Sequence, residues 1–162
     1  MKINLRYLPK KLSKKDRQRQ VHMLFKSRKL YKKGNYFTRK KLSSFQSKKS
    51  NHITNAQRIY KVNKIAPTKE LSRATGCSIS SLSKIVKKGE GAYFSSGSRP
   101  NQTAQSWGLA RLASSITGGK AAAVDYKILE EGCKKNSKAL SLAKKSRRKN
   151  HYGTRRVPKV HV

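Results

Sequence analysis

Lysine and arginine side chains are the chemically distinctive groups of this sequence, and many occur in doublets and triplets. The chain has 41 Lys and Arg against 6 Asp and Glu, a formal charge of +35. A compact chain with this charge repels itself, so we expect a partner that supplies negative charge: nucleic acid, anionic lipid headgroups or acidic protein faces. The candidate contacts are Lys10, Lys11, Lys14, Lys15, Lys32, Lys33, Arg39, Lys40, Lys41, Lys48, Lys49, Arg99, Arg147, Arg148 and Lys149.

Groups suited to catalysis or metal binding are scarce. The acids do not pair at helical spacing in an apolar setting, and the adjacent Glu130 and Glu131 point apart. The histidines neither cluster at ligand spacing nor pair with a cysteine. They are His22, His52, His151 and His161. We therefore expect no enzymatic activity, no metal, no cofactor and no small-molecule substrate.

The two cysteines, Cys77 and Cys133, are far apart in the sequence. The first residues lack the apolar run of a signal peptide, and disulfides are rare in proteins kept in reducing compartments. We therefore expect two separate, partly buried thiols. The sequence also lacks a run of about 18 apolar residues, so it predicts no membrane-spanning helix.

Residues 68–88 have the pattern of a short helix, a glycine turn and a second helix, which resembles a helix-turn-helix. In that motif the second helix would lie in a major groove. The residues near bases would be Ser78, Ser80, Ser81 and Lys84. Helices that read sequence usually carry Arg, Asn or Gln, whereas serine predominates here. Plain packing of two helices is the alternative, and we favour it.

The segment 89–103 is rich in glycine and serine around Arg99. Its backbone could form an anion-binding nest, and Tyr93 and Phe94 could stack on a base. The alternative, which we favour, is a tight loop that hydrogen-bonds to itself, with one of the two aromatic side chains in the core.

Residues 114–121 superficially resemble a phosphate-binding loop. That loop needs glycine where Ser114 stands and a hydroxyl residue where Ala121 stands, and it follows a parallel strand that this sequence lacks. We therefore expect Gly118 and Gly119 to end one helix and begin the next.

The elements that position these residues are predicted to be helices, and the fold class is mainly α. We expect a small helical central domain with an extended basic N-terminal arm and a basic C-terminal tail. Residues 1–65 form the arm, with one helix at about 14–33 and extended segments. Residues 66–133 form the compact helical domain, and residues 134–162 form a helical or extended tail.

Hydroxyl residues and glycines set the expected helix boundaries. Ser13 begins the arm helix, and Gly34 ends it. The remaining helices are expected from Thr68 to Ala74, from Ser78 or Ser80 to Gly89, from Asn101 or Thr103 to Ile116, from Lys120 to Glu131, and from Ser137 to Arg148. In the helix at 120–131, the residues expected to face inward are Val124, Ile128 and Leu129.

Four segments are similar to a family of small basic proteins of unknown function in large double-stranded DNA viruses, among them chlorella and mimivirus-like viruses. The segments are LRYLPKKLSKKD (5–16), KLYKKGNYFTRK (29–40), GEGAYFSSGSRPNQTAQSWG (89–108) and TGGKAAAVDY (117–126). The resemblance extends from Leu5 to Cys133. It implies a viral origin and use in the virion, and it brings no catalytic residues.

Two functions follow as hypotheses. The first is a structural virion protein made in the infected host cell: a minor capsid component that cements major capsid proteins on the inner face of an icosahedral shell. Its partners would be major and other minor capsid proteins, with DNA or an anionic inner membrane surface as further candidates. The alternative is a nucleic-acid-binding protein that condenses or contacts viral DNA.

Overall fold

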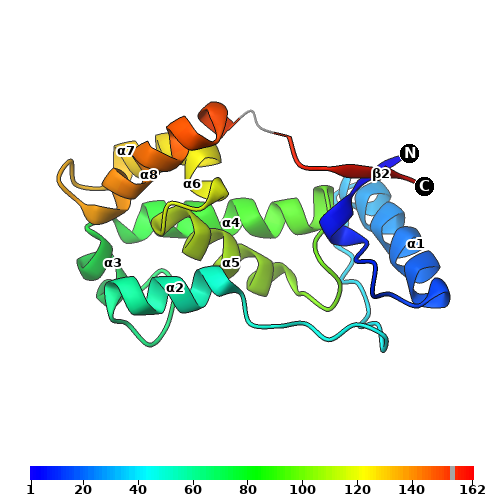
Figure 1. Ribbon diagram of the computed structural model, residues 1–162. Helices are drawn as coiled ribbons and strands as arrows, with labels where there is room; N and C mark the ends of the chain where they lie inside the picture. The colour runs from blue at the N-terminus through cyan, green and yellow to red at the C-terminus, as the bar shows by residue number, and fades with distance from the viewer. Residues whose placement is uncertain (154–155) are drawn as a thin grey trace. The chain divides into compact units, whose positions relative to one another are not determined.

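The computed structural model describes residues 1–153 and 156–162, and its mainly α composition confirms the predicted fold class (Figure 1). The chain divides into two compact units, each assembled from segments that are distant in the sequence. Unit 1 contains Met1–Lys48, Glu90–Trp107 and Arg156–Val162, and unit 2 contains Lys49–Gly89 and Gly108–Arg155. These units do not coincide with the predicted division at 65/66 and 133/134. Composition along the chain does not specify which distant segments pack together.

In unit 1, helix α1 spans Lys14–Tyr31 and begins where the sequence predicts. The Ser13 hydroxyl accepts a hydrogen bond from the backbone N–H of Asp16, which satisfies one of the amides left free at a helix start. Beyond α1, Gly34 has a φ of +79°, a conformation that glycine adopts without steric cost. The predicted start of this helix is therefore confirmed, and its end at Tyr31 falls two residues before the predicted end near 33.

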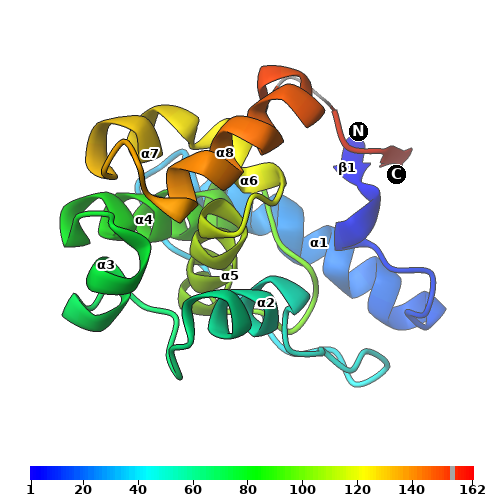
Figure 2. The ribbon, with the colours of Figure 1, turned by 60° about the vertical axis from the view of Figure 1, so that its left-hand side comes forward.

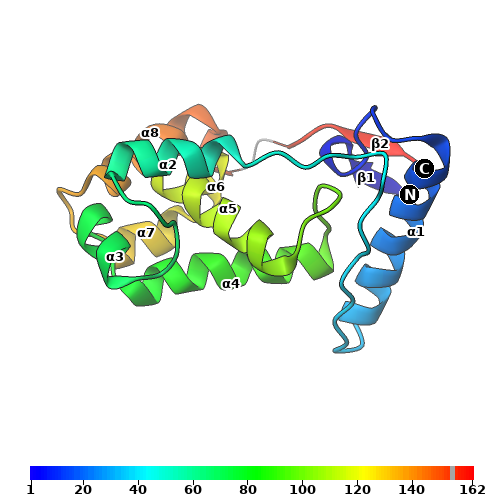
Figure 3. The same cartoon turned by 90° about the horizontal axis from the view of Figure 1, so that it is seen from below.

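The segment 35–50 has no regular structure, as predicted, and it runs back alongside α1 (Figure 3). Hydrogen bonds join Arg39 to Ser27, and Ser44 to Ser13 near the other end of the helix. Leu42 from this segment is buried in an apolar cluster with residues of α1. The surface that this segment covers is therefore part of its own chain, and the segment is not a free arm.

Both ends of the described chain pair in unit 1. Strand β1 (Lys2–Asn4) and strand β2 (Lys159–His161) are antiparallel, with Ile3 opposite Val160 (Figure 1). A short 3-10 helix, η1 (Leu5–Tyr7), follows β1. The apolar cluster of unit 1 includes Ile3, Tyr7, Leu8, Leu12, Met23, Leu24 and Leu42.

Unit 2 begins with helix α2 (Asn51–Tyr60), capped by Ser50. The prediction of one helix within residues 1–65 is therefore wrong. Helix α2 is short and polar on its outer side, so its stability depends on distant contacts. The buried hydroxyl of Tyr60, at the end of α2, donates a hydrogen bond to the backbone carbonyl of Ile116.

Helices α3 (Lys69–Thr75) and α4 (Ile79–Ser95) have the predicted starts, capped by Thr68 and Ser78. The predicted end of the second helix at Gly89 is wrong, because α4 continues for six more residues. A Cβ atom on Gly89 would lie 2.6 Å from the Cα of Gly108 in helix α5. This glycine therefore permits close contact between two helix backbones and does not end the helix.

Helix α5 spans Ala104–Ile116, and the single helix predicted at 120–131 is two: α6 (Lys120–Val124) and α7 (Tyr126–Gly132). The break falls at Asp125, whose carboxylate bonds to side chains of α5. Val124 is 49% exposed, contrary to the prediction that it faces inward. Leu129 is buried, as predicted, and Ile128 is half-buried.

Helix α8 spans Lys138–Lys149 and is capped by Ser137, as predicted; the short 3-10 helix η2 (His151–Gly153) follows it. In unit 2, α8 lies across α6 and α7 (Figure 2), and the unit 2 part of α5 lies between α2 and α4. The core includes Leu71, Leu82, Ile85, Leu112, Ile116, Leu129 and Leu140. Within the described residues, none of the helices combines the length and apolar character that crossing a bilayer requires.

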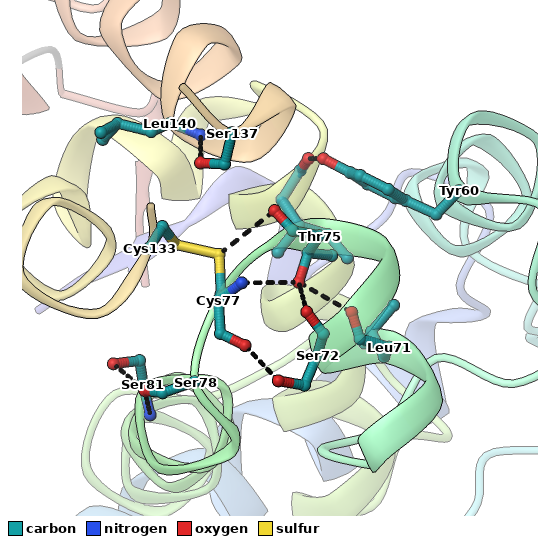
Figure 4. Close-up of a disulfide and its surroundings, with 11 residues drawn as sticks. Tyr60, Leu71, Ser72, Thr75, Cys77, Ser78, Ser81, Cys133, Ser137 and Leu140 are labelled. Carbon is teal, nitrogen blue, oxygen red and sulfur yellow. Dashed lines mark hydrogen bonds between the residues drawn. A yellow bond between two sulfur atoms is a disulfide. The ribbon is translucent and has the colours of Figure 1, made fainter. Parts of the chain in front are cut away.

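Cys77 and Cys133 form a disulfide, so the prediction of two separate thiols is wrong (Figure 4). Two backbone hydrogen bonds flank it, from Ser78 N–H to the Gly132 carbonyl and from Lys134 N–H to the Gly76 carbonyl. The bond joins the start of α4 to the end of α7. Sequence spacing of 56 residues gave no sign of this proximity, because tertiary packing creates it.

Candidate polyanion-binding surface

One side of α1 carries a row of exposed basic side chains, which we call the α1 row. Successive members are four and three residues apart, so those within α1 fall on the same side of the helix, and Lys33 continues the row in the turn just after it. The members are Lys15, Arg19, His22, Lys26, Lys29 and Lys33. The 18 residues of α1 extend about 27 Å at 1.5 Å per residue, and the row covers nearly this length.

The opposite side of α1 fixes the row in place. Gln20, Leu24 and Ser27 are buried on that side. The amide of Gln20 donates to the Tyr7 carbonyl, and the Ser27 hydroxyl donates to the Phe94 carbonyl. Because the helix is held by these contacts, its charges need no further ordering of the backbone to meet a ligand.

Helix α8 carries a second exposed basic surface, which we call the α8 face. Its members are Lys138, Lys144, Lys145, Arg148 and Lys149. The side chains that anchor the helix are Ala139, Leu140, Ala143 and Ser146. The cations at the end of α8 also lie where the helix dipole favours positive charge.

Arg147, a predicted contact, is largely used in packing. Its guanidinium lies 4.3 Å from the ring centre of Tyr126 and 5.0 Å from that of Tyr152. Such stacking stabilises a cation against an aromatic face. Arg147 therefore helps to hold the end of α8 in place, while its neighbours Arg148 and Lys149 are exposed.

Two of the six acidic side chains are buried and bonded internally, which removes them from the surface. In unit 1, the Asp16 carboxylate accepts hydrogen bonds from the Ser44 hydroxyl and backbone N–H, at 2.6 and 3.0 Å. These hydrogen bonds lower the pKa of Asp16 below its ordinary value, and nearby Arg19 contributes in the same direction. Asp16 thus stays ionised while it fastens the returning segment to α1.

In unit 2, Asp125 is fully buried and is held by cations and a hydroxyl. Its carboxylate accepts two hydrogen bonds from the Arg111 guanidinium, at 2.8 and 2.9 Å, and one from the Ser115 hydroxyl at 3.0 Å. The Lys88 ammonium lies 3.4 Å away. A two-point Arg–carboxylate pair is strong and directional, so this cluster locks the break between α6 and α7 onto α5.

The remaining acids are Glu70, Glu90, Glu130 and Glu131, of which only Glu90 is half-buried and the others are exposed. None of them lies in α1 or α8. The α1 row therefore carries little local negative charge apart from Asp16, which lies 3.6 Å from Arg19. Near the α8 face, Glu130 and Glu131 of α7 line one hollow together with Lys144. A polyanion that contacts many such cations binds with an affinity that falls steeply as salt concentration rises.

Arg39, a predicted contact with an anionic partner, is instead buried in unit 1. Its guanidinium donates to the Ser27 hydroxyl, the Tyr93 carbonyl and the Ser98 hydroxyl, at 3.0, 2.8 and 2.8 Å. It also lies 3.8 Å from the ring centre of Tyr93. Burial lowers the pKa of Arg39 from its ordinary value. With these contacts, Arg39 serves the fold and is not available to an external anion.

The other predicted contacts are on the surface apart from the half-buried Arg147. The exposed ones are Lys10, Lys11, Lys14, Lys15, Lys32, Lys33, Lys40, Lys41, Lys48, Lys49, Arg99, Arg148 and Lys149. The prediction missed most of the α1 row and one member of the α8 face: Arg19, His22, Lys26, Lys29 and Lys138. Arg19, Lys26 and Lys138 have no basic neighbour in the sequence, so a search for adjacent doublets does not find them, whereas a search at helical spacing does.

The helix-turn-helix interpretation is not supported by the surroundings of α4. Ser81, expected near bases, is buried, and a Cβ atom on Gly132 would lie 1.6 Å from its hydroxyl oxygen. The end of α7 and the disulfide therefore cover this side of the start of α4 (Figure 4). Ser80 and Lys84 are exposed. Packing of a helix pair, the favoured alternative, describes the arrangement.

The two glycine-rich segments also follow the favoured alternatives. Tyr93 is fully buried, and its hydroxyl accepts a hydrogen bond from the Arg39 backbone. The expected loop is shorter, since residues 89–95 belong to α4. In the other segment, the Ser114 hydroxyl accepts from the Ala121 N–H and its carbonyl accepts from the Gly119 N–H. These two hydrogen bonds connect the end of α5 to the start of α6.

Across residues 1–153 and 156–162, no group of three or more His, Cys, Asp or Glu side chains could hold a metal ion. The fold and surface define a mainly helical protein with two rigid basic surfaces. A family of unknown function, DUF5824, matches residues 5–151, and the chain belongs to this family. No curated protein and no solved structure matches the chain.

Proposed function

We propose that this chain is a non-enzymatic structural protein of a large double-stranded DNA virus particle. It acts as a minor capsid component on the inner face of the shell, where its basic surfaces contact anionic partners. The observation that carries the proposal is the presence of basic surfaces on two buttressed helices, α1 and α8, with the acids Asp16 and Asp125 withdrawn into internal bonds. The similarity of four segments to basic proteins of large DNA viruses supports a location in the virus particle.

Charge, rather than apolar contact, is the attraction that the surface offers. Among the described residues, the exposed large apolar side chains are few: Met1, Leu5, Tyr36, Ile79, Val124, Tyr152 and Val162. Of these, Met1 and Val162 are neighbours in unit 1, joined by backbone hydrogen bonds. Permanent apolar interfaces are built from larger hydrophobic areas. Many weak contacts between lysines and acidic surfaces add up when they are linked in one chain. Cementing by charge therefore fits this surface better than insertion of an apolar anchor.

The disulfide also supports use in a particle. Disulfides persist on virions and in other oxidising surroundings, whereas cytosolic reductants keep most thiols reduced. Cys77 and Cys133 are buried, which slows attack by an external thiol. A protein that is assembled once and then kept in a particle gains from such a bond.

Direct contact with the genome is the second candidate function, and the α1 row is the observation that favours it. A row of basic side chains about 27 Å long is matched to a linear array of phosphates, which in duplex DNA carry one charge per about 1.7 Å of axis. Both functions use the same surface, so the location of the protein within the particle must decide between them.

Gentle disruption of particles separates the two functions. In the capsid case, the protein remains with shells after nuclease treatment. In the genome case, it remains with DNA and is released along a steep salt slope. The test variant combines Lys26→Gln with Lys29→Gln in the α1 row. Its matched control combines Lys61→Gln with Lys64→Gln, at two exposed lysines of unit 2 that lie outside both surfaces. Absence of the protein from purified particles would refute the proposal.

A further inference from the structure

Three aromatic rings form an exposed cluster in unit 1 that neither function above requires. Tyr36 is 73% exposed and its ring centre lies 5.0 Å from that of Phe94 and 6.0 Å from that of Tyr31. Tyr31 and Phe94 are nearly parallel, with an angle of 8° and centres 6.3 Å apart. We call these three rings the aromatic platform.

Separate elements fix the platform. Tyr31 is the last residue of α1, Phe94 lies in the last turn of α4, and the turn at Gly34 brings the chain back to Tyr36. Beneath Phe94, Tyr93 packs edge-on at 5.0 Å and is fully buried. Tyr31 and Phe94 are half-buried, while Tyr36 has most of its surface in water. Tyr36 does not belong to the apolar cluster of unit 1.

The charge around the platform selects the ligand. Lys32 and Lys33 are exposed and lie between Tyr31 and Tyr36 in the sequence, and Lys33 is also the last member of the α1 row. One acid, Glu90, precedes Phe94 by one helical turn and is half-buried. The surroundings are mainly positive, and a ligand that suits them combines negative charge with a flat ring.

We propose that the aromatic platform stacks an unpaired base of single-stranded nucleic acid, whose phosphates continue along the α1 row. Aromatic side chains beside a basic track are the arrangement by which proteins bind single strands without sequence preference. In a duplex the bases are already stacked and paired, so the platform has no free base to accept. This inference rests on the proposed affinity for polyanions and adds a preference for unpaired strands.

A protein partner is the competing occupant of an exposed tyrosine. Interface hot spots cluster in desolvated pockets surrounded by contacts that exclude water. Here exposed lysines flank the ring, and unit 1 has only Met1, Leu5 and Val162 as its other exposed large apolar side chains. The observations therefore favour a nucleic acid.

The test compares a labelled oligothymidylate with a duplex of equal length, by fluorescence anisotropy on the full chain. Tyr36→Ala should weaken binding of the single strand by about 5- to 150-fold, the range of one stacked base. Tyr36→Phe keeps the ring and should retain affinity within about twofold. Duplex affinity should change little in either variant. The control is Ile79→Ala, which removes a 39% exposed apolar side chain from unit 2 outside both basic surfaces.

Salt dependence separates stacking from charge. Tyr36→Ala removes no charge, so the slope of log affinity against log salt should stay the same, whereas Lys33→Gln should reduce it by about 0.7 for a single strand. Equal losses for single strand and duplex, or no loss for Tyr36→Ala, would overturn the base-stacking inference while leaving polyanion binding intact. Failure of the unaltered chain to bind either nucleic acid would overturn the inference and the genome-contact function. Loss of a shell-protein contact in Tyr36→Ala, with DNA binding unchanged, would assign the platform to a protein partner.

Discussion

Breaking the bond between Cys77 and Cys133 should destabilise unit 2 substantially. The bond joins residues 56 positions apart, and both cysteines are buried at 1% and 7% exposure. A cross-link of this span restricts the unfolded chain, and the chain-entropy relation gives about 4 kcal/mol at 25 °C. Domains are commonly stable by only about 5–15 kcal/mol, so the bond supplies a large share of the total.

Urea unfolding followed by far-UV circular dichroism measures this effect. With a typical dependence of about 2 kcal/mol per molar urea, the midpoint should fall by roughly 2 M when the protein is reduced. Comparison of the same chain with and without reductant isolates the cross-link from any change of side chain. The control is the double variant Cys77→Ala with Cys133→Ala, whose midpoint should not respond to reductant.

Two results would refute this reasoning. One is complete alkylation of both cysteines in folded, unreduced protein from oxidising conditions, detected as a mass increase, because a disulfide does not react. The other is an unchanged urea midpoint after reduction of a bond that mass spectrometry has verified. The second result would mean that residual structure in the reduced, unfolded chain already restricts it as much as the covalent bond does.

Three further predictions concern the internal polar bonds and one glycine. Asp125→Asn leaves the Arg111 cation without its buried partner and should lower the free energy of unfolding, measured by urea titration, by about 3–5 kcal/mol. An exposed Glu→Gln control should lower it by less than about 0.5 kcal/mol. The hydrogen bonds from Ser44 lower the pKa of Asp16 in the folded state. The stabilisation that they give is therefore present above the unfolded pKa near 3.8 and is lost as the pH falls through the lower folded value. Asp16→Asn should flatten the dependence of the urea midpoint on pH below about 4. Gly89→Ala places a Cβ 2.6 Å from the α5 backbone and should lower the melting temperature, although alanine favours helices; an unchanged or higher value would contradict the close contact.

Helix starts were predictable because they depend on neighbouring residues. Ser13, Thr68 and Ser137 each accept a hydrogen bond from a backbone N–H three residues later, and this chemistry is visible in the sequence. Gly34 and Gly76 likewise have positive φ angles after a helix. The number and approximate placement of most helices, and the mainly α class, follow from such local signals.

Other features depend on partners far along the chain, so the sequence could not supply them. Gly89 looks like a helix end but accommodates the backbone of Gly108. The break at Asp125 reflects a bond to Arg111 rather than a local breaker. The pairing of the cysteines arises in the same way, since only the packing of α3, α4 and α7 brings them together.

The candidate surface likewise has features that the sequence predicts and features that depend on distant contacts. Counting charges predicted the positive sign of the surface, because most lysines are exposed wherever they stand, but it named as candidate contacts only Lys15, Lys33, Arg148 and Lys149 among the members of the two basic surfaces. It did not identify Arg39 as a buried residue, since that depends on Tyr93 and Ser98, more than fifty positions away. Nor did it reveal that Tyr36 lies on Phe94, which is a contact between segments of unit 1 that the sequence does not relate.

The rigidity of the basic surfaces changes what the charge can do. A disordered basic tail must lose conformational entropy when it binds, at a cost of about 1–2 kcal/mol for each residue that becomes fixed. In α1 and α8 that ordering is completed during folding, by contacts such as those of Gln20 and Leu140. The self-repulsion of fixed charges then opposes folding, and a polyanion relieves it. Binding should therefore raise stability more than it changes secondary structure, which distinguishes this protein from basic arms that fold on their partners.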